Sequence, residues 1–119
     1  MAGRAQRLTT VVTADSMRAA YDFLRAVSFR GLKLPKSGQV TFVPARLRRY
    51  HGFYIYPDHI ITINTGTPDI QRMVQIMAHE MCHAALEQNA ESDHAEHDEH
   101  FNALARIIEG EMGWPKGCI

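Results

Sequence analysis

Cysteines, long apolar runs and net charge are all scarce in this sequence, and each scarcity excludes a class of protein. Only two cysteines occur among 119 residues, Cys82 and Cys118, and neither belongs to a Cys-x-x-Cys pair. Their number argues against a disulfide framework and a zinc ribbon, and it favours a reducing compartment. No stretch approaches the ~20 consecutive apolar residues of a membrane span, and residues 1–17 lack the apolar run of a signal peptide. We therefore expect a cytoplasmic protein with one domain over residues 1–119.

The formal net charge is zero, but the charges are unevenly distributed along the chain. Residues 1–50 carry ten Lys or Arg against two acids, whereas residues 51–119 carry three against eleven. Such a separation is compatible with a basic face for a polyanion, and equally with a dipolar surface whose halves neutralise each other.

The first half of the chain predicts one helix followed by three strands. Apolar residues at helical spacing follow Asp15, which we expect to cap an amphipathic helix that ends near Gly31. The stretch "QVTFVP" is β-branched and alternating, which predicts a strand stopped by Pro44. The stretches "GFYIY" and "HIITIN" predict a hairpin around a turn at Pro57 and Asp58.

The second half predicts two helices. The longer one has Thr67 as its expected N-cap and Pro68 at its first helical position, and it continues with apolar residues at helical spacing. After an acidic, histidine-rich connection, a last helix should end near Gly110 or Gly113. The order helix, three strands, helix, helix predicts the α+β class, with a three-stranded sheet of antiparallel type and a core over about residues 14–114.

Within the longer helix, residues 79–83 read HEMCH and match the pattern HExxH. Side chains four residues apart lie on one helix face, so His79 and His83 can reach a single ion, for which Zn²⁺ is the natural choice. Glu80 is rotated by about 100° from His79, which makes it a poor third ligand but places it well beside a water at the ion. The alternative is two surface histidines beside a glutamate. A metal site is favoured because these polar residues interrupt the most apolar helix, where an unpaired glutamate would be costly.

A catalytic zinc site needs a third protein ligand and one open position. His94, His97 and His100 are the candidates downstream of the motif. His97 begins a helical stripe that Phe101 continues, which places His97 in the first turn of the last helix on its core-facing side. We therefore expect His97 to be the third ligand, with His94, near a possible cap at Asp93, and His100 as alternatives.

These elements together resemble the SprT-like (Spartan-type) zinc metalloprotease domain. The resemblance is carried by "HEMCHA", a spacer of about a dozen residues, and His97 four positions before Phe101. It extends upstream, since "VTFVPARLRRYHGFYIYPDHIITIN" is similar to the segment before that family's HExxH helix, and it covers roughly residues 17–114. Asp98 is a departure, because members often have glycine there.

The resemblance implies a small zincin-like domain with zinc metalloendopeptidase activity. His79, His83 and His97 would bind Zn²⁺, and Glu80 would act as general base on a metal-activated water. A nearby donor would help to stabilise the oxyanion, and the possible donors are Tyr50, His51, Tyr54 and Tyr56. The strand "IITIN" could align an extended peptide substrate.

Relatives of this type act on proteins bound or crosslinked to DNA, so the resemblance also implies DNA association and a role in DNA–protein crosslink repair. Arg46, Arg48 and Arg49 in "ARLRRYHG" would suit a phosphate-facing surface. Alternatively, these arginines are solvated and protect a strand edge from aggregation. Two further interpretations remain open: a non-catalytic zinc-containing module that binds DNA or protein, and a zinc hydrolase acting on small amides or nucleic acid.

Overall fold

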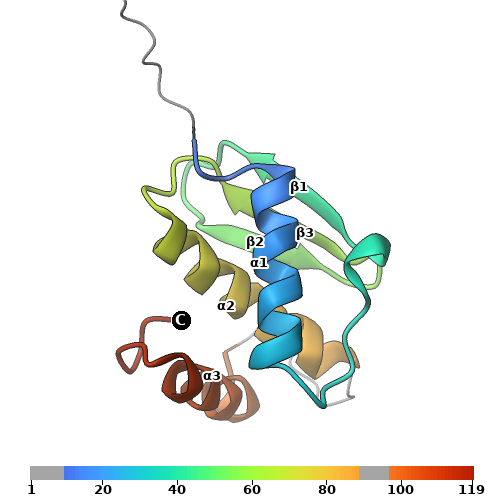
Figure 1. Ribbon diagram of the computed structural model, residues 1–119, viewed down its shortest axis with the longest axis vertical. Coiled ribbons are helices and arrows are strands. Elements are labelled where there is room, and N and C mark those ends of the chain that lie inside the picture. The colour runs from blue at the N-terminus through green and yellow to red at the C-terminus, as the bar shows by residue number, and fades with distance from the viewer. Residues whose placement is uncertain (1–9, 89–96) are drawn as a thin grey trace, which may run out of the picture.

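The computed structural model describes residues 10–88 and 97–119 (Figure 1). In chain order its elements are α1 (Ala14–Val27), the 3-10 turn η2 (Ser37–Gln39), β1 (Thr41–Ala45), β2 (Gly52–Ile55), β3 (Ile60–Asn64), α2 (Ile70–Gln88) and α3 (Glu99–Met112). The α+β class and the order of the elements are therefore as predicted. Among the described residues, no helix has the length and apolar character needed to cross a membrane.

The three strands form a mixed sheet in the order β1-β3-β2. β2 and β3 are antiparallel, which confirms the predicted hairpin, but β1 runs parallel to β3 and not antiparallel as expected. The chain inserts β3 between the two earlier strands, and the alternation of side chains within a strand carries no information about that choice. Pro44 lies inside β1 and does not stop it, because β1 is an edge strand that can spare one N–H group.

The N-caps of α1 and α2 each differ from the predicted residue by two positions. The N-cap of α1 is Thr13 and not Asp15, and Thr13 forms a capping box with Ser16. The N-cap of α2 is Asp69, whose Oδ1 accepts a hydrogen bond of 2.8 Å from the amide of Arg72. The Thr67 hydroxyl, expected to cap α2, instead donates to the carbonyl of Asn64 at 2.7 Å in the turn that follows β3.

α2 is the central element of the fold. It packs against α1, α3, β2 and β3, while α1 also covers β1 (Figure 1). Gly52 lets the chain of β2 come close to its neighbours, since a Cβ there would lie 2.5 Å from the carbonyl oxygen of Thr62 and 3.3 Å from Ile76 Cγ2. One face of α2 therefore lies directly beside the outer strand β2. The largest fully buried apolar side chains come from α1, β3, α2, α3 and the loop after α1: Met17, Tyr21, Leu24, Phe29, Ile61, Ile63, Met73, Met77, Met81, Phe101 and Ile108.

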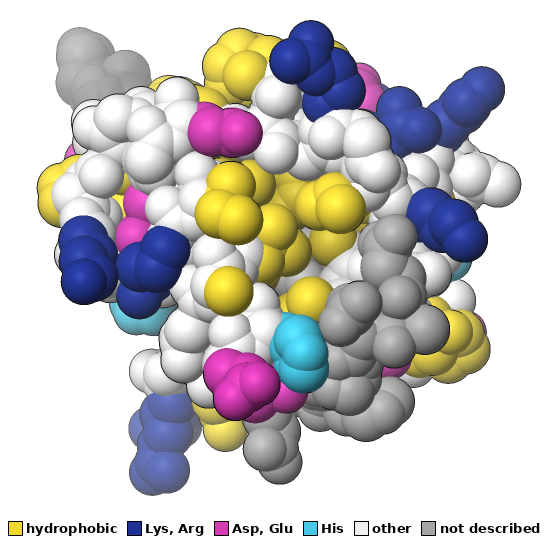
Figure 2. All heavy atoms as spheres, turned by 90° about the horizontal axis from the view of Figure 1, so that it is seen from below, with side chains coloured by type: hydrophobic (Ala, Val, Ile, Leu, Met, Phe, Trp, Pro, Cys, Tyr) yellow, Lys and Arg dark blue, Asp and Glu magenta, His cyan; other side chains and the backbone are white. Residues whose placement is uncertain are grey.

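The Lys and Arg side chains on the face shown in Figure 2 are not gathered into one patch. There, Lys and Arg side chains are spread around the edge, and apolar side chains gather in a hollow at the centre. This face therefore carries no single basic surface.

Candidate metal centre

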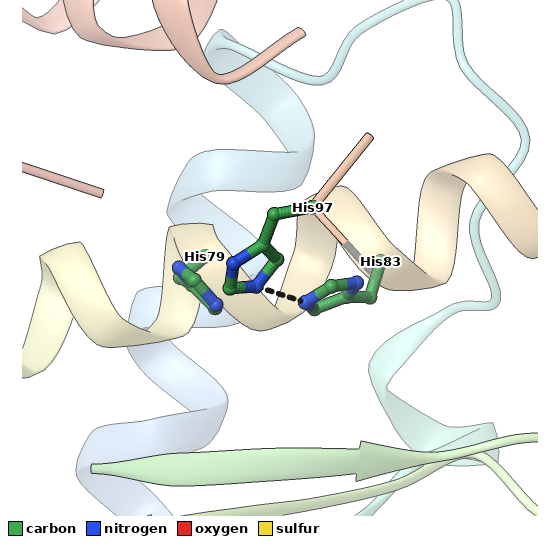
Figure 3. Close-up of side chains that lie close together, drawn as sticks. All are labelled: His79, His83 and His97. Atoms are coloured by element: carbon green, nitrogen blue, oxygen red, sulfur yellow. Dashed lines mark hydrogen bonds between the residues drawn. The ribbon is translucent and has the colours of Figure 1, made fainter. Parts of the chain in front are cut away.

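Three histidines converge on one point. His79 and His83 project from α2, and His97 reaches them from the segment just before α3 (Figure 3). Their potential ligand atoms all lie within 4.8 Å of one another, and the Nε2 atoms of His83 and His97 are 3.2 Å apart. Two nitrogens bound tetrahedrally to one zinc ion at about 2.0–2.1 Å would be separated by about 3.3 Å. The spacing of His83 and His97 therefore fits a shared metal ion, and His79 lies close enough to be the third donor.

His97 does not lie in the first turn of α3 as predicted, but two residues before the helix begins. Asp98 is the N-cap, and its Oδ1 accepts a hydrogen bond of 3.0 Å from the Phe101 amide. This hydrogen bond is the main cause that holds the pKa of Asp98 below its usual value. The Asn102 side chain also donates to the carbonyl of His97 at 3.3 Å. Asp98, the departure from the family pattern, thus fixes the point at which the chain leaves the metal centre and enters α3.

The alternative third ligands do not join this cluster in the described residues. His100 lies in α3 with its side chain 49% exposed, and its Nδ1 is 3.8 Å from Asp98 Oδ2. His94 and the proposed cap Asp93 lie outside the described residues.

Phe101 packs against all three imidazoles. Its ring centroid lies 4.5 Å from that of His97, 4.6 Å from that of His83 and 5.0 Å from that of His79. The side chain is fully buried, so it cannot move without disturbing the core. Phe101 therefore limits the orientations that the three rings can adopt.

The environment of His79 keeps its imidazole neutral. Burial, followed by the neighbouring His83 and His97 and by the more distant Arg72 and His51, lowers the pKa of His79 to about 3. A neutral imidazole offers the lone pair that a metal ion needs. The protonation state of this residue therefore also fits a metal site.

Glu80 lies beside the three histidines but outside their cluster. Its side chain is only 5% exposed, and burial raises the pKa of its carboxyl group to about 8. Among the described residues, no side chain or backbone amide donates a hydrogen bond to this carboxyl group. An unpaired polar group in such a place costs free energy, so its position needs a reason other than stability.

The three histidines and Glu80 line a cleft of about 890 Å³. Residues 49–56, including all of β2, form one side of it, and residues 117–119 contribute another part of its wall. All four candidate oxyanion donors line this cleft, but Tyr54 is already engaged, because its hydroxyl lies 3.2 Å from His59 Nδ1. Burial raises the pKa of Tyr54 to about 12, so its hydroxyl group stays protonated at neutral pH.

The wall formed by residues 117–119 was not foreseen from the sequence. It is held by Glu109, a carboxylate only 2% exposed, which accepts hydrogen bonds of 3.0 Å from the amides of Gly117 and Ile119. Arg106 donates to the same carboxylate at 2.7 and 2.9 Å. Burial alone would raise the pKa of Glu109, but these amides and Arg106 together lower it. Glu109 follows the buried Ala105 by four residues, and this acidic interruption of an apolar stripe is the signal that could have identified it.

Arg72 is a second residue of the cleft that was not predicted from the sequence. It lies on the same face of α2 as the histidines, and its Nη1 donates to the carbonyl of Cys118 at 3.0 Å and to Gln75 Oε1 at 3.2 Å. Arg72 therefore attaches the segment of residues 117–119 to α2, whereas Glu109 attaches it to α3.

Comparisons with known proteins agree with this geometry. The model of the SprT-like family matches residues 17–118. No match was found among curated proteins. Among solved structures, the crystal structure of the zymogen of the metallopeptidase abylysin from Pyrococcus abyssi is similar, with 20% sequence identity, a TM-score of 0.51, and coverage of 79% of this chain and 76% of that chain. At this level of identity the likeness concerns the fold alone.

Proposed function

The chain belongs to the SprT-like family, and we propose that it is a zinc metalloendopeptidase that acts on proteins associated with or crosslinked to DNA. The observation that carries the proposal is the convergence of His79, His83 and His97 beside the unpaired, buried carboxyl group of Glu80. Three imidazoles with one nearby carboxyl group are the donor set of a hydrolytic zinc site, in which one position stays open.

Each residue of the site has a defined task in this proposal. The three histidines would hold zinc, which would supply Lewis-acid chemistry by polarising the scissile carbonyl group and making the attacking water more acidic. Glu80 takes a proton from that water and passes it to the leaving amine. The low exposure of Glu80 keeps bulk water away from the proton that it transfers.

The strand that would align the substrate is β2. The prediction that "IITIN" has this role is wrong, because β3 is paired on both sides, by β1 and by β2. Within the described part of the chain, β2 is paired on one side only, and its residues line the cleft. An extended peptide can add to such a free edge through backbone hydrogen bonds, beside the metal centre.

The proposed contact with DNA rests on the loop between β1 and β2. Arg46, Arg48 and Arg49 in this loop are all exposed. Arg49 also lines the cleft together with Tyr50, whose side chain is 65% exposed. Arginines attract phosphates and an exposed tyrosine can stack on a base, so DNA bound here would bring an attached protein to the cleft.

Asn64 at the end of β3 holds this loop in shape. Its Nδ2 donates hydrogen bonds of 3.0 Å to the carbonyls of Leu47 and Tyr50, and its Oδ1 accepts from the Gly66 amide at 2.9 Å. These hydrogen bonds attach the loop to the sheet, so the backbone that carries its arginines is held in one conformation.

The decisive experiment measures bound zinc and proteolysis in the same samples. We expect one zinc ion per chain and cleavage of casein, with an increase when single-stranded DNA is added. Glu80→Gln should keep the zinc and lose turnover. His97→Ala should lose zinc, whereas the matched control His100→Ala should keep both properties.

Other outcomes identify the alternative functions. Zinc binding with DNA affinity that is unchanged in Glu80→Gln, and no cleavage of any protein, would indicate a non-catalytic binding module. Hydrolysis of small amides or nucleic acid without proteolysis would indicate a hydrolase of another class.

For the DNA contact, replacing both Arg46 and Arg48 with Gln should reduce the slope of log affinity against log salt by about two. An unchanged slope would remove this loop from the DNA-binding surface.

A further inference from the structure

The cleft contains a cation for which the proposed chemistry has no use. Arg72, Ile76, His79 and His83 are spaced three or four residues apart and therefore share one face of α2. Arg72 lines both this cleft and a second cavity of about 690 Å³ around the start of α2. It precedes His79 by seven residues, which corresponds to about 10 Å along the helix.

Arg72 is partly buried and has no carboxylate partner among the described residues. Only its Nη1 is used, by two neutral acceptors, although a guanidinium group has five N–H donors. The nearest candidate, Asp69, uses its Oδ1 to cap the helix through the Arg72 amide and forms no ion pair with the guanidinium group. Arg106 provides the contrast, because it makes a two-pronged contact with Glu109. Partial burial removes part of the hydration of the Arg72 guanidinium group, and no anion of the described residues replaces it. Binding of a ligand's carboxylate to this group is therefore favourable.

The other charged groups along the cleft give it a direction. Arg49 lines it together with Arg72, whereas Glu87 lies at the other end of α2, one turn beyond His83. The cationic groups therefore lie towards the start of α2 and an anionic group towards its end. Such an arrangement favours acidic side chains of a bound peptide near Arg72.

We propose that Arg72 determines specificity by binding an acidic side chain of the substrate peptide. The inference rests on the proposed peptidase function. An extended peptide advances about 3.3 Å per residue, so the distance from His79 to Arg72 corresponds to about three residues. The arginine side chain reaches towards Gln75, which shortens the distance between the guanidinium group and the metal centre. The acidic residue of the peptide should therefore lie about two or three residues from the scissile bond, on the Arg72 side.

Quenched fluorescent peptides test this directly. One neutral parent peptide is varied by placing Asp, Asn or Lys at each position on either side of the bond that is cut. For the zinc-loaded protein, we expect kcat/KM to be roughly tenfold higher with Asp than with Asn at one position near the predicted distance, and lower with Lys. Arg72→Glu should reverse this order, and Arg72→Lys should keep the order with a smaller ratio. Arg30→Glu, the same charge change at an exposed residue that does not line the cleft, should leave all ratios unchanged.

Binding to the zinc-loaded Glu80→Gln protein separates this inference from the proposed function. If the Asp peptide binds this protein more tightly than the Asn peptide, but the wild type cleaves neither, the peptidase proposal fails and the acid-binding role of Arg72 stands. If all peptides are cleaved and bound equally well, the role of Arg72 is overturned and the peptidase proposal survives. A loss of single-stranded DNA binding in Arg72→Glu without any change in peptide preference would also overturn it, in favour of a phosphate contact. Both variants are first checked for an unchanged thermal transition, and Arg72→Lys keeps the test valid if Arg72→Glu does not fold.

Discussion

Glu80 and Glu109 are both buried, with 5% and 2% of their side chains exposed, yet their surroundings differ completely. Glu109 accepts hydrogen bonds from two backbone amides and from Arg106, and these lower the pKa of its carboxyl group despite burial. Glu80 has no such donor among the described residues, and burial raises the pKa of its carboxyl group. A buried carboxylate with all its partners stabilises a structure, whereas one without partners is held ready for a proton. The comparison therefore assigns a structural role to Glu109 and a catalytic role to Glu80.

The largest effect expected from this comparison is on catalysis. Glu80→Gln should lower kcat by roughly 10²–10⁴-fold, the usual contribution of a general base, because the amide cannot accept the proton. Glu109→Gln, assayed at a temperature where it is folded, should stay within a few-fold of the wild type. Steady-state kinetics on casein or a quenched peptide measure both variants. Equal losses in kcat would show that the two residues do not have separate tasks.

The next largest effect is on stability and concerns Glu109. Glu109→Ala removes a buried carboxylate and leaves Arg106 and two amides without their acceptor, which should cost about 2–3 kcal/mol of unfolding free energy. Urea unfolding of the metal-free protein measures the change. Glu111→Ala, at an exposed position of the same helix, is the control and should change the free energy by less than about 0.5 kcal/mol. A small effect at Glu109 would mean that residues 117–119 are held mainly by other contacts.

A smaller effect follows from pH. The pKa of Glu109 is lower in the folded chain than its usual value of 4.5. The carboxylate therefore contributes its full stabilisation above the unfolded pKa and loses it as pH falls through the lower folded pKa. The difference in urea midpoint between wild type and Glu109→Gln should be constant near pH 7 and shrink towards pH 3. A difference that stays constant down to about pH 3 would contradict the assignment of a charged Glu109.

The smallest effect concerns a third carboxylate, Asp98, which caps α3 at the surface next to His97. Asp98→Ala should weaken zinc binding by roughly tenfold, at the lower end for groups that position a metal ligand, because the chain after His97 loses its anchor. Asp98→Asn can still cap the helix and should bind zinc nearly as well as the wild type. Competition with a chromophoric chelator measures the affinities. Equal weakening in the two variants would point to the charge of Asp98 and not to its capping bond.

The parts of this fold that sequence reasoning predicted are those that depend on local spacing. The periodicity of apolar residues gave the three helices, and the four-residue spacing of His79 and His83 gave two members of the cluster. His97 was selected because it precedes Phe101 by four residues, and Phe101 does pack against its ring. The reason was only partly correct, since His97 lies before the helix and the cap at Asp98 places it.

The parts that could not be predicted depend on contacts between distant residues. β1 pairs in parallel with β3 although β2 lies between them in the sequence, so the pairing joins strands that are not consecutive in the chain. Arg72 and Cys118 are separated by 46 positions in the sequence, so neither residue reveals its partner. Asp69 replaced Thr67 as the cap of α2 because the Thr67 hydroxyl found an acceptor in the preceding turn, a competition that composition alone does not decide.

The position of residues 117–119 has a practical consequence for work with this protein. Because the amide of Ile119 is bound to Glu109 and the residue lines the metal cleft, any residues joined after it leave the fold at the rim of the cleft. A polyhistidine tag fused there would bring extra imidazoles next to His79, His83 and His97, where they could compete for the ion or fill the cleft. Purification handles are better joined at the N-terminal side of the chain, because Thr10, the first described residue, does not line this cavity. Such handles are best removed before zinc is quantified.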